Sequence, residues 1–221
     1  MARQMLSEAE RNRVTQAVSA AETGTDGEIV TVVTELSDAY HDVALHYGVI
    51  AALAVTAIGA IWPEVLSPLD RGWTTDDLSA DLFALLLAQA AAFLLVRGLL
   101  HWMPLRLLLT PRATKSRRVR RRAVQYFKIG AESRTAGREG VLLYLSAGEH
   151  MAEIVADEAV HRAVPAERWG EAMAALVDEV RAGRVGDGMA AAAKAIGTIL
   201  AEHFPKSADN PNELPDRVIE L

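Results

Sequence analysis

The chain has 221 residues, of which 51% are hydrophobic, 24% are charged and only 5% are aromatic. Its formal net charge of −6 argues against a protein that coats nucleic acid with its whole surface. The absence of cysteine excludes disulfide bonds, thiol nucleophiles, iron–sulfur clusters and cysteine-ligated zinc.

The N-terminal segment predicts a helix followed by a strand. It has no continuous apolar run, so we expect no cleavable secretory signal. Ser7 and Glu10 have the S-x-x-E spacing of a capping box, and apolar residues recur on one helical face behind them, which predicts a helix from about 7 to 22. Residues 28–36 (EIVTVVTEL) are short and rich in β-branched side chains, which predicts a central strand.

Two long apolar runs follow. Residues 43–62 contain no Asp, Glu, Lys or Arg, and residues 82–103 are interrupted only by Gln89, Arg97 and His101. Each run is about as long as a helix that crosses a hydrocarbon core of roughly 30 Å. We therefore expect a two-helix transmembrane hairpin over residues 43–104. A pair of core helices in a soluble bundle is the alternative.

The charges that flank these runs predict their orientation. The connection between them is acidic, whereas the segment after the second run has no acid before Glu132. The acids are Glu64, Asp70, Asp76, Asp77 and Asp81, and the bases are Arg106, Arg112, Lys115, Arg117, Arg118, Arg120, Arg121 and Arg122. By the positive-inside rule we expect a multi-pass protein of the inner (plasma) membrane, of bacterial type, with both termini in the cytoplasm.

Small residues recur at every fourth position in both runs. They are Gly48, Ala52, Thr56 and Ala60 in the first run and Ala84, Ala88 and Ala92 in the second. Such stripes let helix backbones approach closely in a membrane, so we expect them to pack the hairpin against itself. A homo-oligomer formed through the same stripes is the alternative.

A basic amphipathic helix is predicted directly after the second run. It begins at Thr110 and Pro111, presents Val119, Ala123 and Phe127 as an apolar side, and ends before residue 131. The bases in its first three turns are Arg112, Lys115, Arg117, Arg118, Arg120, Arg121 and Arg122. Because the helix leaves the bilayer directly, we expect it to contact anionic membrane lipids, at about 1 kcal/mol per base. The sequence has no recognised DNA- or RNA-binding motif, so we expect no nucleic acid partner. We do expect a membrane-protein partner.

The C-terminal part returns to an α/β pattern. Residues 140–146 (GVLLYLS) and 151–156 (MAEIVA) predict two strands that form a hairpin. Two helices follow, the first ended by Gly183 and the second capped by Asp187. The polar tail from Pro205, with its three prolines, is expected to be extended and only partly ordered.

Four segments carry a family resemblance: GEIVTVVTEL, REGVLLYLSAGEHMAEIVAD, the helix around Trp169 and the closing FP…NELPD. With the order of the elements, they resemble the TPM-domain family, and the stretch from Glu139 to Asp157 is the most specific. The resemblance implies an α/β fold in which helices flank a small mixed sheet (an α/β/α sandwich), usually tethered to a membrane. Residues 1–42 and 105–221 would form one split cytoplasmic domain, interrupted by the hairpin. The commoner family arrangement, an extracytoplasmic domain before a single C-terminal span, differs from this one.

Acidic residues surround the predicted strand hairpin. Glu149, Glu153 and Asp157 are candidate metal ligands, because carboxylates suit a hard cation such as Ca²⁺ or Mg²⁺. In a strand Glu153 and Asp157 would share a face and His150 would point to the other. A solvated hairpin edge is the alternative interpretation.

A second acidic set occurs in the tail and consists of Asp209, Asn210, Glu213 and Asp216. It lacks the glycine-kinked spacing of a calcium loop, so we expect these residues to pack back on the domain.

The family resemblance implies weak acid phosphatase activity, divalent metal binding or a role as an auxiliary factor of membrane complexes. The sequence contains neither a G-x-x-x-x-G-K-[ST] loop nor a G-x-S-x-G elbow, and it assigns no catalytic residue. The expected function is therefore a membrane-anchored TPM-like interaction or regulatory module on the cytoplasmic face that binds a divalent metal. A weak metal-dependent acid phosphatase is the alternative.

Overall fold

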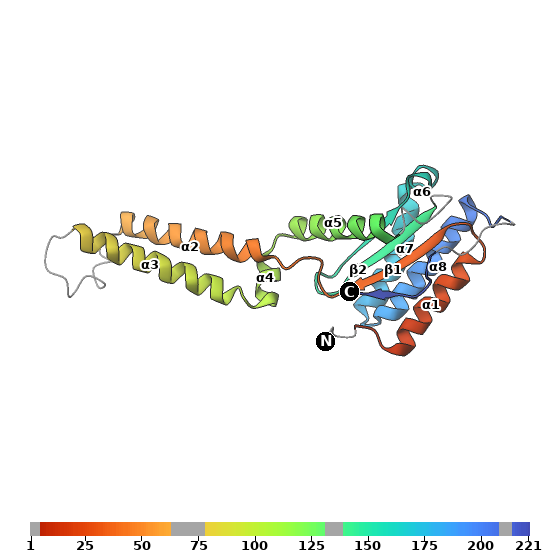
Figure 1. Ribbon diagram of the computed structural model, residues 1–221, viewed down its shortest axis with the longest axis horizontal. Helices are drawn as coiled ribbons and strands as arrows, with labels where there is room; N and C mark the ends of the chain where they lie inside the picture. The colour runs from red at the N-terminus through yellow and green to blue at the C-terminus, as the bar shows by residue number, and fades with distance from the viewer. Residues whose placement is uncertain (1–4, 63–77, 131–138, 208–213) are drawn as a thin grey trace. The chain divides into compact units, whose positions relative to one another are not determined.

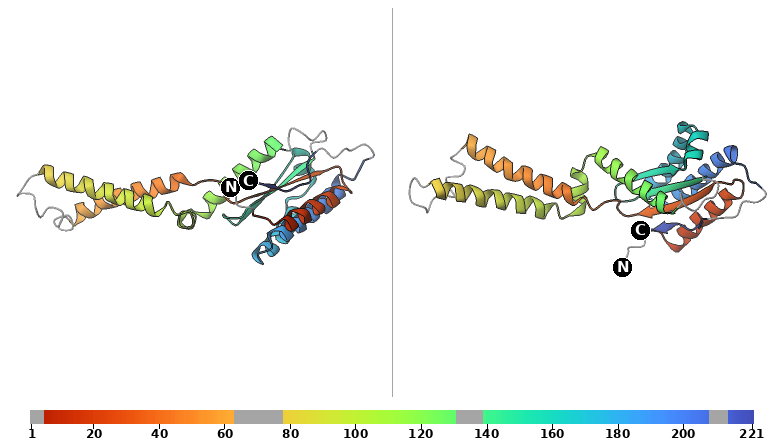
Figure 2. Two further views of the ribbon diagram at one scale, coloured as in Figure 1. Left: turned by 60° about the horizontal axis from the view of Figure 1, so that its bottom comes forward. Right: turned by 45° about the horizontal axis from the view of Figure 1, so that its top comes forward.

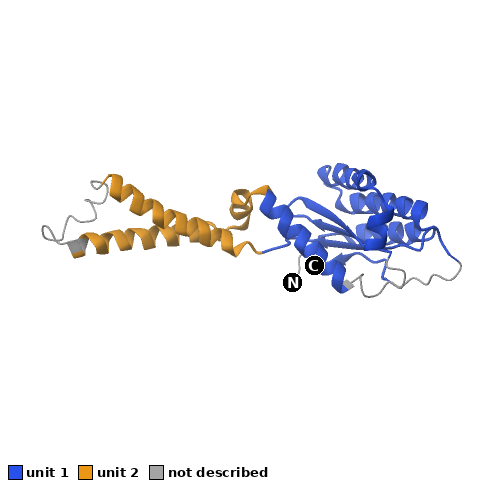
Figure 3. Ribbon diagram, turned by 90° about the horizontal axis from the view of Figure 1, so that it is seen from above, with its two compact units in different colours: residues 1–38, 113–221 blue, residues 39–112 orange. Residues whose placement is uncertain are grey.

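The computed structural model describes residues 5–62, 78–130, 139–207 and 214–221. The chain divides into two compact units, which Figure 3 shows in different colours. Unit 1 combines residues 1–38 with residues 113–221, and unit 2 consists of residues 39–112. Unit 1 is thus assembled from two separate stretches of chain.

Unit 1 is built on a four-stranded mixed sheet with the order β3-β2-β1-β4 (Figure 1). β1 (Glu28–Thr34) pairs in parallel with β2 (Gly140–Ser146) and with the short β4 (Ile219–Glu220). β2 pairs with β3 (Met151–Ala156) in antiparallel fashion. Every residue of β1 and β2 is buried, as expected for central strands that are covered on both faces.

One face of the sheet is covered by α1 (Glu8–Glu22), α7 (Ala166–Arg181) and α8 (Val185–His203) (Figure 2). Their apolar side chains form a hydrophobic core with alternate strand residues such as Ile29 and Leu143. α1 begins with the predicted capping box of Ser7 and Glu10. A short helix that the sequence analysis did not predict, α6 (Glu158–Ala163), follows β3.

The opposite face is covered by α5 (Arg112–Gly130), which lies across the sheet from α1 and α8 in Figure 2. Val119 and Phe127 of α5 pack against Val32 and Tyr144 in a second hydrophobic core. Helices therefore flank both faces of a mixed sheet, and the expected α/β fold is confirmed.

Unit 2 contains α2 (His41–Ile61), α3 (Leu78–Leu99) and the short α4 (Met103–Leu109). α2 and α3 lie side by side (Figures 1 and 2). Gly48 is buried, and a Cβ added to it would lie 2.9 Å from the ring of Phe93. A hydrogen bond from Gln89 Nε2 to Thr56 Oγ1 joins the two helices. Both helices are long and apolar enough to cross a membrane.

Several element boundaries differ from the sequence-based expectations. The second long helix ends at Leu99, and a turn leads into α4, whose first turn contains Pro104. Asp187 lies in the first turn of α8, where Arg184 is the N-cap residue. The end of the tail is more ordered than predicted, because residues 219–220 pair with β1.

Candidate functional site

The basic residues of α5 fall into two groups, and the first is held by contacts within unit 1. These contacts join Arg118 to Asp38 (3.1 Å), Arg120 to Glu153 (3.5 Å) and Arg122 Nε to the main-chain oxygen of Ser37 (3.1 Å). The Arg122 guanidinium also lies 5.7 Å from the ring centroid of Tyr126. These three arginines help to fix α5 and the segment before α2 in place.

The second group makes no hydrogen bond or ion pair with any residue that the structure describes. We call these residues the unpaired bases of α5; they are Arg112, Lys115, Arg117, Arg121 and Lys128. All except Lys115 are exposed. At 100° per residue, Arg117, Arg121 and Lys128 fall within about 40° of one another on the helix, opposite the buried Ala123. Arg117, Arg121 and Lys128 therefore form a cationic surface on the exposed side of α5.

A buried polar network lies on the sheet face that α5 covers. Ser37 donates its main-chain N–H to Glu149 Oε1 and Oε2, each at 3.0 Å, and its hydroxyl lies 3.0 Å from the hydroxyl of Tyr144. Burial is the main cause that raises the pKa of Tyr144 to about 12, so this hydroxyl stays protonated. Gly148 is required in the adjacent turn, since a Cβ there would lie 2.6 Å from the Glu35 carbonyl oxygen.

The three predicted metal ligands have separate positions and separate partners. Glu149 lies before β3 and binds Ser37, whereas Asp157 follows β3 and accepts the Gly140 N–H at 3.0 Å. Glu153, in the middle of β3, faces Arg120. Among the residues described, no three His, Cys, Asp or Glu side chains are grouped to hold a metal ion. The metal site stays a prediction from sequence.

Of the second acidic set, Asp209, Asn210 and Glu213 lie outside the described residues, so only Asp216 is placed. A different acid, Glu22, is buried at 7% exposed and was not among the residues predicted from the sequence. Its Oε1 accepts the Ile29 N–H at 2.7 Å, and its Oε2 has no hydrogen-bond partner among the described residues. Burial, followed by the nearby charge of Glu28, raises the pKa of Glu22 to about 8. No local sequence signal distinguishes this glutamate from an exposed one.

A cavity of about 480 Å³ runs along β3, one of the two edge strands of the sheet. Trp169 and Met173 of α7 line it together with the Arg120–Glu153 pair and His161. Burial raises the pKa of Glu153, while Arg120 opposes this shift. The described residues that line the cavity include two acids, Glu153 and Glu158, as well as an imidazole and a guanidinium, but no hydroxyl or thiol nucleophile.

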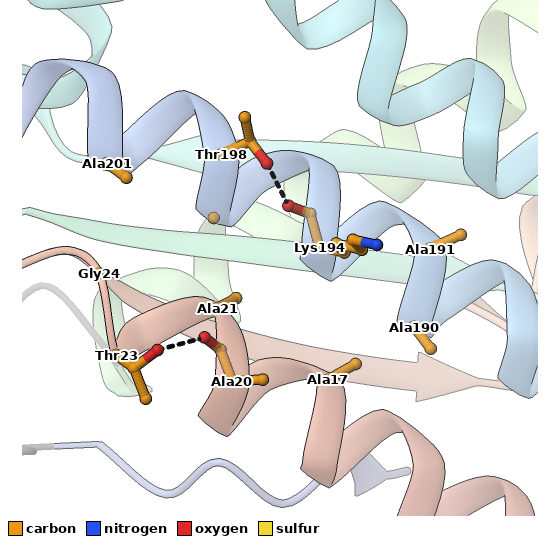
Figure 4. Close-up of a pocket in the computed structure, with 11 residues that line it drawn as sticks. Ala17, Ala20, Ala21, Thr23, Gly24, Ala190, Ala191, Lys194, Thr198 and Ala201 are labelled. Atoms are coloured by element: carbon orange, nitrogen blue, oxygen red, sulfur yellow. Dashed lines mark hydrogen bonds between the residues drawn. The ribbon is translucent and has the colours of Figure 1, made fainter.

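A second cavity, of about 620 Å³, lies between α1 and α8 and is shown in Figure 4. Its wall consists mainly of alanines. The hydroxyls of Thr23 and Thr198 donate to carbonyl oxygens of their own helices, at 2.7 and 3.1 Å. Lys194 is the one charged residue among the described residues of the wall, which therefore offers little for catalysis.

The fold and these surfaces define an α/β domain whose sequence is interrupted by a helical insertion. A basic helix follows this insertion in the sequence. Residues 104–199 match the family model of the TPM domain, so the chain contains a TPM domain. The matched range runs from α4, in unit 2, to α8. Most of it lies in unit 1, which also contains α1 and β1.

One solved structure has the same fold, the NMR structure of the BA42 protein from the psychrophilic bacterium Bizionia argentinensis. The TM-score is 0.59 at 16% sequence identity, and the alignment covers 100% of this chain and 99% of the other. None of the curated proteins matches the chain.

Proposed function

We propose that α2 and α3 are a transmembrane hairpin that anchors the TPM domain to a membrane. The observation that carries this proposal is the exposure of their apolar side chains. The most apolar window is 11% buried in α2 and 0% buried in α3, whereas a core helix of a soluble protein is mostly buried. Leu53, Leu94 and Leu95 are each more than 60% exposed. Lipid would cover such surfaces without further protein.

The flanking charges support one orientation of this hairpin. The acidic connection lies outside, and the basic segment that begins with Arg106 lies in the cytoplasm. Both stretches of unit 1 are then on the cytoplasmic side, where they can fold together into one domain.

The unpaired bases of α5 give this domain a way to contact anionic lipids. α5 follows the hairpin closely in the chain, and each base near an anionic surface contributes about 1 kcal/mol. Arg118, Arg120 and Arg122 contribute less to lipid binding, because their guanidinium groups already have partners within unit 1.

The role that fits this arrangement is an interaction or regulatory module for a membrane partner. Two of the predicted metal ligands, Glu149 and Asp157, are buried and accept main-chain N–H groups. A metal-dependent phosphatase would instead need carboxylates that converge on a metal. Hydrolysis of p-nitrophenyl phosphate by the purified full chain, with and without Ca²⁺ or Mg²⁺, tests that alternative.

Membrane anchoring is tested by washing membranes that contain the full chain with alkaline carbonate. We expect the protein to remain in the pellet, and a Leu53→Arg, Leu94→Arg double variant to be lost from it. Ile129→Arg is the matched control, because Ile129 is a similarly exposed apolar residue of α5, outside both spans. Release of the unaltered protein into the wash would contradict the proposal.

A further inference from the structure

A small cavity in unit 2 is lined by cationic side chains. It has a volume of about 290 Å³ and lies where α2 begins and α3 ends. Its lining residues are His41, Ala44, Leu94, Arg97, Gly98, His101 and Arg106.

Arg106 is the buried member of this group, at 4% exposed. Its guanidinium donates to three carbonyl oxygens: those of Leu100 (2.7 Å), Ala39 (2.6 Å) and His101 (3.4 Å). These oxygens accept three of its five N–H groups and carry no formal charge. Among the described residues no carboxylate pairs with Arg106. A buried guanidinium without a counter-ion is costly, so the site favours an anion.

Arg97 adds a second positive charge to the same cavity. It is exposed, lies in the last turn of the apolar α3, and has no hydrogen bond or ion pair with a described residue. The first turn of α2 supplies part of the wall through His41 and Ala44, and its N-cap residue, Tyr40, makes no side-chain capping bond. The positive end of the α2 dipole therefore reinforces the two arginines.

We propose that this cavity binds the phosphate group of an anionic phospholipid, with Arg97 and Arg106 as its cationic contacts. The inference rests on the proposed transmembrane hairpin, which places this end of α2 and α3 at the level of the lipid headgroups. Guanidinium groups bind phosphate oxygens strongly and with defined geometry. Leu94, 64% exposed in the same wall, continues into the apolar surface of α3, along which an acyl chain can lie. This apolar continuation favours a lipid over free phosphate.

The test uses the purified full chain in a neutral detergent, titrated separately with phosphatidylglycerol, phosphatidylcholine with the same acyl chains, and inorganic phosphate. Binding is measured by native mass spectrometry. We expect phosphatidylglycerol to bind at least about tenfold more tightly than the other two, and Arg97→Gln to weaken it by about tenfold, as for loss of one charged hydrogen bond. Arg181→Gln, which removes an exposed arginine of α7, should leave the affinity unchanged.

Arg106 also donates hydrogen bonds to three carbonyl groups, so its replacement would disturb the fold. The second variant therefore changes another position. A Cβ at Gly98 would meet no atom within 4 Å, so Gly98→Leu adds bulk at the cavity wall and removes no charge. It should also weaken phosphatidylglycerol binding.

Inorganic phosphate that binds as tightly as phosphatidylglycerol would overturn the inference, because it would indicate a soluble ligand. An unchanged affinity in Arg97→Gln would also overturn it. A chain that stays in carbonate-washed membranes but shows no preference for phosphatidylglycerol would refute this inference alone. A chain released by carbonate would refute the proposed anchoring as well.

Discussion

The main-chain N–H of Ser37 donates to both carboxylate oxygens of Glu149, although 112 positions separate these residues in the sequence. Both residues are buried. Ser37 lies at the end of the first stretch of unit 1, and Glu149 lies in the turn between β2 and β3. The bond therefore joins the two stretches from which unit 1 is assembled, close to the residue at which unit 1 ends and the chain continues toward α2.

Glu149→Ala should lower the free energy of unfolding by about 1–3 kcal/mol, because the Ser37 N–H would remain buried without its acceptor. The measurement is chemical denaturation of the detergent-solubilised full chain. Asp178→Ala, at an exposed position of α7, is the control and should change stability little. Equal effects of the two changes would mean that the Ser37–Glu149 bond contributes nothing.

Glu22 should make stability depend on pH. Burial raises its pKa in the folded state to about 8 from an ordinary value of 4.5, so the folded protein holds a proton that the unfolded chain releases. Its contribution is complete below about pH 4.5 and is lost as pH rises through about 8. Glu22→Gln stays neutral and should remove this decline from a plot of thermal midpoint against pH. Parallel curves for the two proteins would refute the assignment.

The small residues of α2 and α3 should tolerate enlargement unequally. Ala52 and Ala88 are partly buried, whereas Ala90 is exposed. Ala52→Leu or Ala88→Leu should therefore force the helices apart and cost about 1–3 kcal/mol, while Ala90→Leu should matter less. Thermal unfolding in detergent measures the difference. Equal tolerance at the three positions would indicate that the small-residue stripes face lipid, and loss of a crosslinked dimer in Ala52→Leu would indicate self-association.

Neighbouring arginines of α5 should differ in their effect on stability. The Arg118 side chain is 16% exposed and pairs with Asp38, whereas Arg117 is exposed and unpaired among the described residues. Arg118→Gln should lower the free energy of unfolding by about 1 kcal/mol, and Arg117→Gln should change it by less than about 0.5 kcal/mol. Denaturation at low ionic strength gives both values. A larger loss for Arg117→Gln would reverse the division between paired and unpaired bases.

Local patterns were sufficient to predict most of the secondary structure. The Ser7–Glu10 capping box and the β-branched residues from Glu28 act over a few neighbouring positions, and both elements formed where expected. The two-residue β4 could not be predicted, because its pairing with β1 depends on contacts distant in sequence.

The candidate sites were harder to predict for the same reason. Sequence grouped Glu149, Glu153 and Asp157 by proximity along the chain, but the antiparallel hairpin gives each a different partner. Sequence likewise treated the bases of α5 as one set, and only the packing of α5 on the sheet separates paired arginines from unpaired ones.

The most direct test of the account is the membrane topology of the full chain. A reporter that fluoresces only in the cytoplasm can be fused after Leu221 or inserted near Gly72, in the connection between the two apolar runs. The account predicts a bright fusion at Leu221 and a dark one near Gly72. The reverse pattern would contradict the orientation, and bright signals at both positions would contradict a transmembrane hairpin.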